Sequence, residues 1–348
     1  TSPAPENIAG NAVVCANSTQ VYSITNRVGS VYSWTVPGGA AIVGDPSASS
    51  ITVIFSNVGG TITVRETNAA GCITNHNSKG VTVNPLPTAT ISGGGTICDG
   101  ASRNLSVDFT GTGPYTFTYA LNGVPQAPVA TASDPYTLNV TLAGTYTIVN
   151  VTDANCTNNG TGTTTVSYFP KPTGTISGTT ELCRGSSATL TMTFTGTAPF
   201  TFTYTDGTTP VTIVGHLTNV YTVSVSPLVN TTYTLTSLTD GNSCTGVVSG
   251  SAVISINLPP VLALIGTNLI CYNVKTGAVN MSITDGTAPF GYSWTGPNGF
   301  FANTQNISSL EAGYYAVVVN DSKGCTGTAN ITLTQPPVLN GSAAGTNI

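Results

Sequence analysis

The chain has 348 residues, of which only 6% are charged, 8 Lys+Arg and 13 Asp+Glu, against about 25% in an average soluble protein. Threonine is unusually frequent, and 39 Gly and 21 Pro accompany it. So few cations cannot neutralise a run of phosphates, which excludes a basic nucleic-acid binder. Scarce Glu, Lys and Arg disfavour helical bundles, and a 40% hydrophobic content disfavours charge-driven disorder. No stretch approaches about 20 apolar residues, so no membrane span is expected.

The eight cysteines set a period along the chain. They lie at positions 15, 72, 98, 156, 183, 244, 271 and 325. A long interval therefore alternates with a short one from the first cysteine to the last. This spacing predicts repeats of about 80–90 residues with two cysteines each.

Each repeat carries the same elements in the same order: an aromatic strand, an alternating strand, a turn that ends in the second cysteine, and a Pro-rich junction. The aromatic strands read VYSWTV, PYTFTYAL, PFTFTYTD and PFGYSWTG, and the alternating strands read TITVRE, TYTIVNV, TYTLTSL and YYAVVVN. The turns read TNAAGC, TDANC, TDGNSC and NDSKGC, and the junctions read NPLPT, FPKPT, NLPPV and QPPV. Repeats two and three match each other most closely, as in TISGGGTIC against TISGTTELC.

Apolar residues alternate with Thr or Ser through these segments, which predicts strands with one buried face. β-branched and aromatic residues favour strands, whereas Gly, Asn, Asp and Pro interrupt them. No segment has helical periodicity. Several short antiparallel strands in a repeat of this length predict a two-sheet sandwich with immunoglobulin-like topology.

Repeat four resembles an SprB-type repeat through SWTGPNGF, QNISSLEAGYYAVVVNDSKGC and TLTQP. Such repeats occur in giant surface adhesins of gliding Bacteroidetes. Repeat one resembles the PKD-like domains of the same secreted proteins, through GNAVVCANSTQVYSI, YSWTVPGGA and ITVRETNAAGC. Repeats two and three resemble the Ig-like repeats found alongside them. The resemblance implies a surface or secreted protein exported by the type IX system, and it brings no catalytic residues.

The expected fold class is all-β, an elongated tandem array of four immunoglobulin-like/PKD-like β-sandwiches. We expect a PKD-like sandwich at 1–84, Ig-like sandwiches at 85–170 and 171–257, and an SprB-type repeat at 258–336. The final segment QPPVLNGSAAGTNI mirrors LPPVLALIGTNLIC at the opening of repeat four. Residues 337–348 are therefore expected to start a fifth repeat.

The sequence predicts no enzyme, no catalytic residues and no cofactor. Its two histidines, His76 and His216, lie in polar loop sequences and are expected to be solvated. No GxSxG motif is present. Glu occurs only at positions 6, 66, 181 and 311, whereas a glycosidase needs two convergent carboxylates in one pocket.

The best candidates for metal ligands are the aspartates before the second cysteines, Asp153, Asp240 and Asp321, with Asn68 in the same place in repeat one. An isolated Asp in a turn more often bonds its own backbone than a calcium ion. The cysteines lack the CxxC spacing typical of zinc sites. The aromatic strands suggest either a carbohydrate platform or, as is usual in such sandwiches, the core.

The leading functional hypothesis is a structural stalk segment of a very long secreted bacterial cell-surface adhesin or filament, acting as a disulfide-stiffened spacer in adhesion or gliding. Two alternatives stay open, an array of glycan-binding modules and a self-assembling extracellular fibre subunit. The expected partners are neighbouring repeats of the same long chain, with surface polysaccharide or other adhesin or filament chains as further candidates. The expected location is extracellular, at the bacterial cell surface, where disulfides persist.

Two disulfide patterns are compatible with the repeats. Local pairing joins Cys15–Cys72, Cys98–Cys156, Cys183–Cys244 and Cys271–Cys325. In an immunoglobulin-like topology, however, the first cysteine lies between the first two strands and the second lies in the last hairpin. These turns are about 25 Å apart, whereas a disulfide needs Cα atoms within about 7 Å. The staggered pattern joins Cys15–Cys156, Cys98–Cys244 and Cys183–Cys325, and leaves Cys72 and Cys271 for neighbours outside this segment. The distance argument slightly favours the staggered pattern.

Overall fold

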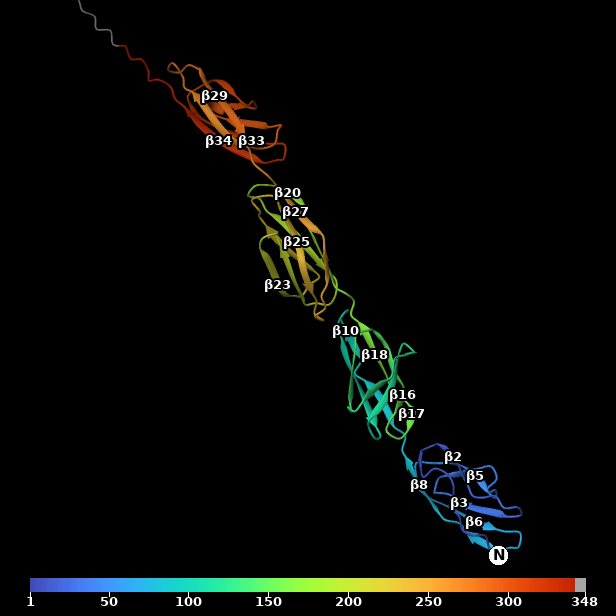
Figure 1. Cartoon of the computed structure of the whole chain (residues 1–348). Helices are drawn as coiled ribbons and strands as arrows, with labels where there is room; N and C mark the ends of the chain where they lie inside the picture. Colours follow the sequence, from blue (N-terminus) through green and yellow to red (C-terminus); the bar gives the residue numbers. More distant parts are fainter. Residues whose placement is uncertain (342–348) are drawn as a thin grey trace, which may run out of the picture. The chain divides into compact units, whose positions relative to one another are not determined.

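The structure is a computed structural model that describes residues 1–341. Within these residues every element is a strand except one 3-10 turn, η1 (Pro297–Gly299), and no helix has the length and hydropathy of a transmembrane span. The chain divides into two compact units, Thr1–Phe169 and Pro170–Ile348. Among the described residues the strands of each unit pair into four β-sheets, and Figure 1 labels some of these strands. The all-β prediction is therefore confirmed. The predicted start of a fifth repeat at 337–348 lies outside the described residues from position 342 onward.

The first two sheets form one sandwich at the start of unit 1. One sheet has the order β2 (Thr19–Ser23), β5 (Ser50–Ile54), β4 (Ala41–Val43). The other has the order β1 (Val13–Cys15), β8 (Lys79–Asn84), β6 (Gly60–Thr67), β3 (Val31–Thr35), with β7 (Ile73–Asn75) also paired to β6. Both sheets contribute to a single core that includes Tyr22, Trp34, Val53 and Ile62.

The second sandwich completes unit 1. One sheet has the order β15 (Tyr136–Val140), β11 (Arg103–Thr110), β9 (Thr88–Ser92). The other has the order β10 (Gly95–Ile97), β18 (Thr163–Tyr168), β16 (Gly144–Thr152), β12 (Tyr115–Leu121), β13 (Val124–Pro125). Two short strands flank this sheet, β14 (Val129–Thr131) on β12 and β17 (Thr157–Asn159) on β16. Leu105, Val107, Phe117 and Ile148 lie in their shared core.

The third sandwich begins unit 2. One sheet has the order β24 (Val220–Val225), β21 (Ala188–Phe194), β19 (Thr173–Ser177), β26 (Val247–Ser249). The other has the order β20 (Thr180–Cys183), β27 (Ser251–Asn257), β25 (Thr231–Thr239), β22 (Phe200–Thr205), β23 (Pro210–His216). The core between them includes Leu190, Met192, Phe202 and Ile254.

The fourth sandwich has the fewest strands of the four among the described residues. One sheet has the order β28 (Val261–Thr267), β29 (Gly277–Thr284), β32 (Ile307–Leu310). The other has the order β31 (Phe301–Ala302), β30 (Gly291–Thr295), β33 (Gly313–Asn320), β34 (Thr326–Leu333). Val279, Trp294, Tyr315 and Val317 lie in the core.

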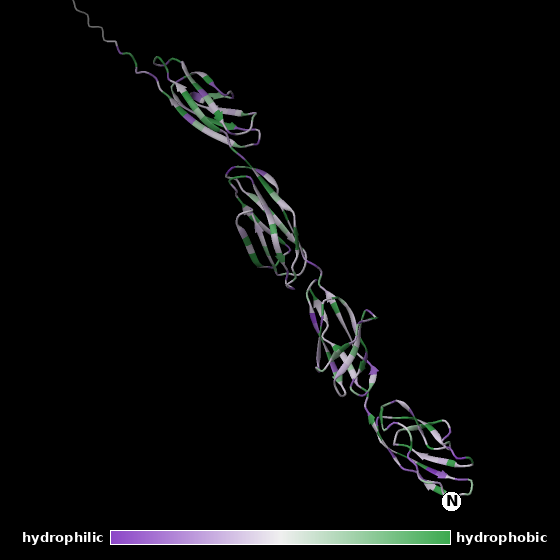
Figure 2. Ribbon diagram, in the orientation of Figure 1, coloured by the Kyte–Doolittle hydropathy of each residue, from purple (hydrophilic) through white to green (hydrophobic). Residues whose placement is uncertain are grey.

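Side-chain alternation explains why these segments form strands that face a core. Along β22, Phe200, Phe202 and Tyr204 are buried, and the threonines between them are only partly so. The hydropathy colours in Figure 2 show few strongly hydrophilic strand positions, in agreement with the low content of charged residues. Trp34 and Trp294 on the aromatic strands are buried. The interpretation of the aromatic strands as core is therefore confirmed.

A short strand before the first cysteine pairs in parallel with the last strand in three of the sandwiches. β1 pairs with β8, β10 with β18, and β20 with β27. In the first and third sandwiches the register places Cys15 beside Asn84 and Cys183 beside Asn257. These two asparagines are the final residues of their last strands. The first cysteine therefore lies where the chain leaves its sandwich for the Pro-rich junction.

Candidate functional site

The candidate site is the junction between consecutive sandwiches within each unit, where a disulfide joins them. In unit 1, Cys15 of the first sandwich is bonded to Cys156 of the second, with a Cα–Cα distance of 5.8 Å. In unit 2, Cys183 of the third sandwich is bonded to Cys325 of the fourth, with a Cα–Cα distance of 5.4 Å. These are two of the three staggered bridges. Cys98 and Cys244 are also in the disulfide form, and their pairing with each other stays a prediction.

Local pairing is wrong, because each of its four pairs contains a cysteine that is bonded elsewhere. Cys15 is not available to Cys72, Cys156 to Cys98, Cys183 to Cys244, or Cys325 to Cys271. Strand geometry gives the reason in the first sandwich. Cys15 lies beside the end of β8, and β8 is antiparallel to β6. The eight residues of β6, at about 3.3 Å each, separate that level from the hairpin that carries Cys72.

Both junctions place the second sulfur against the last strand of the preceding sandwich. The sulfur of Cys156 lies 4.0 Å from the carbonyl oxygen of Asn84. The sulfur of Cys325 lies 3.9 Å from the carbonyl oxygen of Asn257. The two junctions therefore share one local geometry.

A buried aspartate holds the hairpin that presents the second cysteine. Asp153 is 7% exposed. Its Oδ1 accepts hydrogen bonds from the backbone N–H groups of Asn155 (2.8 Å) and Cys156 (2.6 Å). Its Oδ2 accepts one from the backbone N–H of Thr112 (2.9 Å), in the loop between β11 and β12. One carboxylate therefore fixes the cysteine turn and also ties it to a second loop.

The same arrangement recurs in the third and fourth sandwiches. Asp240 accepts the backbone N–H groups of Asn242, Cys244 and Thr197 at 3.0, 3.1 and 3.2 Å. Asp321 accepts those of Lys323, Cys325 and Thr287 at 3.0, 2.7 and 3.1 Å. In the first sandwich Asn68 takes this place, and its Oδ1 accepts the N–H groups of Ala70 and Cys72 at 3.0 and 2.9 Å.

The environment of Asp153 favours its charged form. Burial by itself would raise the pKa of this carboxyl, because it disfavours the charge. The backbone N–H groups of Thr112, Cys156 and Asn155 outweigh burial, and the net effect is a lowered pKa. The carboxylate is thus an ionised hydrogen-bond acceptor in the folded chain.

The metal candidates Asp153, Asp240 and Asp321 all bind backbone N–H groups in the structure. Each carboxylate uses both oxygens to accept backbone N–H groups, so the expectation that a turn aspartate bonds its own backbone is confirmed. The three lie in different sandwiches. Within residues 1–341 no three His, Cys, Asp or Glu side chains gather as a metal-binding group.

The sequence patterns did not single out the glycine that directly precedes each threonine whose N–H binds a turn aspartate. Gly111 has φ +115°, and a Cβ there would lie 2.5 Å from Asp153 Oδ2. Gly196 has φ +113°, and a Cβ there would lie 3.1 Å from Asp240 Oδ2. A side chain at either position would therefore press on the carboxylate and strain the backbone. The signal was present as a Gly-Thr pair that recurs at 111, 196 and 286.

A second polar cluster lies inside the first sandwich around Glu66, which is fully buried. Glu66 Oε1 accepts a hydrogen bond from Ser30 Oγ (2.6 Å), and Oε2 accepts from the Arg27 guanidinium and from His76 Nε2 (3.1 Å). Burial raises the pKa of Glu66, but the hydrogen bonds from Ser30, Arg27 and His76 and the charge of Arg27 lower it overall. Glu6 also approaches Arg27, at 3.6 Å.

The expectation that His76 is a solvated loop residue is wrong, because the residue is only 6% exposed and its side chain is fully buried. The backbone N–H of Glu6 donates to its Nδ1 (3.3 Å). With Nδ1 as the acceptor, Nε2 is the ring nitrogen that faces Glu66. Every oxygen of the two carboxylates in this cluster accepts a hydrogen bond, since Glu6 accepts those of Thr25. The cluster braces the sandwich: Glu66 is fully buried, and the Glu6 side chain is 27% exposed.

His216 is also not a solvated loop residue. It is half-buried at the end of β23, and its Nε2 lies 3.0 Å from the carbonyl oxygen of Val220. Its ring packs edge-on against Phe202 and Tyr221. These contacts give His216 a packing role.

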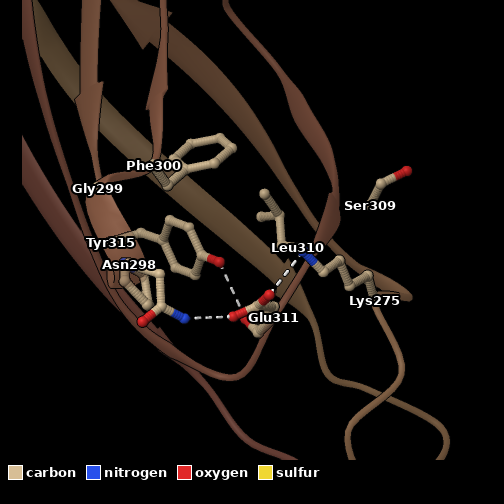
Figure 3. A pocket seen from close by; sticks show the side chains of 9 residues that line it. Lys275, Asn298, Gly299, Phe300, Ser309, Leu310, Glu311 and Tyr315 are labelled. Atoms are coloured by element: carbon tan, nitrogen blue, oxygen red, sulfur yellow. Dashed lines mark hydrogen bonds and ion pairs between the residues drawn. The ribbon is translucent and has the colours of Figure 1, made fainter.

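A pocket of about 180 Å³ opens on the fourth sandwich (Figure 3). Lys275 Nζ lies 2.7 Å from Glu311 Oε1, and Asn298 Nδ2 donates to Glu311 Oε2 (2.7 Å). The hydrogen bond and charge of Lys275 lower the pKa of Glu311, and those of Glu311 raise the pKa of Lys275. Tyr315 Oη donates to the Glu311 carbonyl (3.0 Å). One carboxylate paired with one ammonium offers neither an acid pair nor a nucleophile with a base.

Residues 1–81 match the family model of the PKD-like domain, and residues 92–160 match that of the Ig-like domain of the nucleoporin POM152. No curated protein matches the chain. An I-band fragment of titin is similar with 14% identity, a TM-score of 0.40, and 74% of this chain and 99% of that chain covered. A fragment of a 1.5-MDa bacterial ice-binding adhesin has 15% identity, a TM-score of 0.38, and coverages of 72% and 97%. A tetra-tandem repeat from the extending region of a large adhesion protein has 18% identity, a TM-score of 0.27, and coverages of 94% and 100%. The described residues form an all-β array of sandwiches, in which residues 1–81 are similar to PKD-like domains and residues 92–160 to an Ig-like domain.

Proposed function

We propose that this chain is a mechanical spacer segment of a secreted adhesin or filament at the bacterial cell surface. The observation that carries the proposal is the pair of disulfides that join consecutive sandwiches, Cys15–Cys156 and Cys183–Cys325. Disulfides persist in oxidising compartments outside the cytosol. A covalent bond across each junction limits how far the junction can open when the chain is pulled.

The resemblance of repeat four to SprB-type repeats supports a finer form of the proposal. In that form the chain belongs to a type IX-secreted surface adhesin of a gliding Bacteroidetes species, and it acts as an elongated stalk. The low charge supports a role that does not depend on titrating groups, since only 21 residues of 348 carry a charge. The neighbouring repeats of the same long chain are then its main partners.

The arrangement of polar groups supports a structural role over catalysis. Within residues 1–341 no buried side-chain nitrogen or oxygen lacks a hydrogen-bond partner. The Glu66 cluster and the aspartate turns use their oxygens to hold the fold together. We therefore propose that the chain has no enzymatic activity and needs no cofactor.

A tethered-bead assay tests the spacer function. The full chain is attached to a surface by one end and to a bead by the other, and the tether length is followed under flow. The oxidised chain is expected to hold the bead at constant length, and reductant is expected to let the tether lengthen. A tether that lengthens equally in both states would contradict the proposal.

A binding assay addresses the glycan-binding alternative. The central aromatic strands are buried, so exposed aromatics such as Phe301 (66% exposed) and Tyr314 (57%) are the side chains left for a sugar. The chain is expected not to bind a panel of surface polysaccharides. Binding that disappears on Phe301→Ala or Tyr314→Ala would replace the spacer proposal with a binding module.

A further inference from the structure

Two cysteines are free, Cys72 and Cys271. Each is placed like one half of a bonded junction: Cys72 like the second cysteine of a bridge, and Cys271 like the first. We infer that Cys271 of one copy and Cys72 of a second copy form a disulfide of the same kind, which links chains head to tail. This interaction goes beyond the spacer role and does not depend on it.

Cys72 is presented by a turn of the same kind as the turn that presents Cys325. In both turns the capping residue stands four positions before the cysteine, Asn68 before Cys72 and Asp321 before Cys325. The backbone N–H of the capping residue donates to the cysteine carbonyl, at 3.1 Å for Asn68 and 3.0 Å for Asp321. The cap accepts the cysteine N–H in return, at 2.9 and 2.7 Å. Cys72 is therefore held in a bridging conformation of the hairpin although it carries no bridge.

Cys271 occupies the other half of the junction, beside the exit of the fourth sandwich. Leu269 donates its backbone N–H to the Thr334 carbonyl (3.0 Å), and Asn273 donates its own to Gln335 Oε1 (2.9 Å). Gln335 precedes the Pro336 junction, as Asn84 precedes Pro85 beside Cys15. Cys271 thus lies near the exit of its sandwich, two residues after the N–H that bonds the exit strand, whereas Cys15 and Cys183 lie one residue before it.

The surface around Cys271 is open and apolar. Cys271, Ile270, Tyr272 and residues 336–339 line a pocket of about 390 Å³. Ile270 is 73% exposed and Tyr272 is 50% exposed. At the bonded junctions, the corresponding level is covered by the cysteine hairpin of the next sandwich, whose sulfur contacts Asn84 or Asn257. A hairpin of this kind from a second copy is the occupant that continues the established junction.

No like charges would oppose a junction between Cys271 of one copy and Cys72 of another. The residues two positions before the cysteines are Glu181 and Lys323 at the Cys183–Cys325 junction, and these side chains form an ion pair at 2.7 Å. At the Cys15–Cys156 junction the same positions are Val13 and Ala154. The inferred junction would combine Leu269 with Ala70. It therefore resembles the uncharged junction of unit 1 and brings no like charges together.

The bond forms by thiol–disulfide exchange with a small-molecule disulfide such as oxidised glutathione. The Cys271 thiolate attacks one glutathione sulfur, which makes a mixed disulfide and releases one glutathione thiol. The Cys72 thiolate of the second copy then attacks the Cys271 sulfur and displaces the second glutathione. The two protein thiols lose two protons and two electrons, and the small disulfide is reduced to two thiols.

Two complementary variants of the full chain test the inference. Cys72→Ser retains only Cys271 as a free thiol, and Cys271→Ser retains only Cys72. Each variant alone and the equimolar mixture are incubated with oxidised glutathione, and the products are read on non-reducing gels and by mass spectrometry of the cross-linked peptides. The mixture is expected to give a dimer that stops at two chains and contains a Cys72–Cys271 peptide. Wild type is expected to give a ladder.

The inference requires at least tenfold more dimer in the mixture than in either variant alone. Equal dimer in the single variants would mean unspecific oxidation of exposed thiols and would overturn it. A mixture that stays monomeric, or a wild-type monomer with an internal Cys72–Cys271 bond, would overturn it as well. Folding of both variants is checked by the retained Cys15–Cys156 and Cys183–Cys325 peptides. These internal bridges would survive such a failure, so the spacer proposal is tested separately.

Discussion

Pulling on the two ends of the oxidised chain should extend only a small part of it. The force follows the backbone to Cys15, crosses to Cys156, and later crosses from Cys183 to Cys325. The two bridges bypass 141 and 142 residues, and 348 less these two numbers leaves about 65 residues on the loaded path. At about 3.6 Å per extended residue the limit is about 23 nm, against about 125 nm for the fully reduced chain.

Single-molecule force spectroscopy with handles on both ends measures these limits directly. The oxidised chain should stop near 23 nm, and reductant should release it toward 125 nm, by the same estimate of extended length. The double variant Cys15→Ser, Cys156→Ser restores up to 141 residues to the loaded path. This adds about 50 nm to the extended length, or about 40 nm if a Cys98–Cys244 bond provides a shorter route through the second and third sandwiches. Such a bond does not shorten the wild-type path, because the route through Cys15 and Cys183 is already shorter. An oxidised wild-type chain that extends to about 65–75 nm or more, the length expected when one of the two bridges is open, would refute the reasoning.

Three further predictions concern the buried carboxylates. Asp153→Ala leaves three backbone N–H groups without acceptors and should lower the local stability by about 3–5 kcal/mol. Faster hydrogen exchange at Thr112 and Cys156 would show this loss. Asp153→Asn keeps one side-chain oxygen and should lower the local stability less. Glu66→Gln removes the charge that holds Arg27 and should lower the free energy of unfolding by about 2–3 kcal/mol, measured by denaturant titration, whereas Glu311→Gln at the exposed pair should leave it unchanged. Because the folded-state pKa values of Asp153 and Glu66 are lowered, their stabilisation should be complete above pH of about 4–5 and fade as pH falls through the lowered values, so acid unfolding should be shallower in Asp153→Asn.

Much of the fold follows from local pattern. Alternation along YTFTYAL places Phe117 in the core and Thr118 toward the other face, as the sequence indicates. Cysteine spacing indicated the repeats because the second cysteine lies in the same capped turn in every sandwich. The Asx turn of Asp153 is also local, since its first oxygen bonds groups two and three residues ahead.

Long-range contacts account for what the sequence did not reveal. His76 stands in a polar stretch, TNHNSK, and its burial depends on Glu66 and on Glu6, which is 70 residues away. The second oxygen of Asp153 binds Thr112, 41 residues upstream. The parallel pairing of Val13 with Thr82, which carries Cys15 to the exit of its sandwich, depends on the closure of the whole sandwich. No window of sequence contains these partners.

The disulfide and the aspartate turn together explain how weakly charged, Thr-rich sandwiches could serve under load. A pull that crosses to Cys156 enters the second sandwich at its cysteine hairpin, and residues 16–155 are bypassed. The loaded residue is therefore held by its own turn: Asp153 Oδ1 accepts the Cys156 N–H, and the Asp153 N–H donates to the Cys156 carbonyl (2.9 Å). The second oxygen transfers part of the load to the Thr112 loop. The pull therefore enters the second sandwich through a small hydrogen-bonded hairpin, and the hydrogen bonds of Asp153 are the first to resist it. From Cys156 the load follows the backbone to Cys183 through β18, β19 and β20, so the cores that hold these strands also bear it.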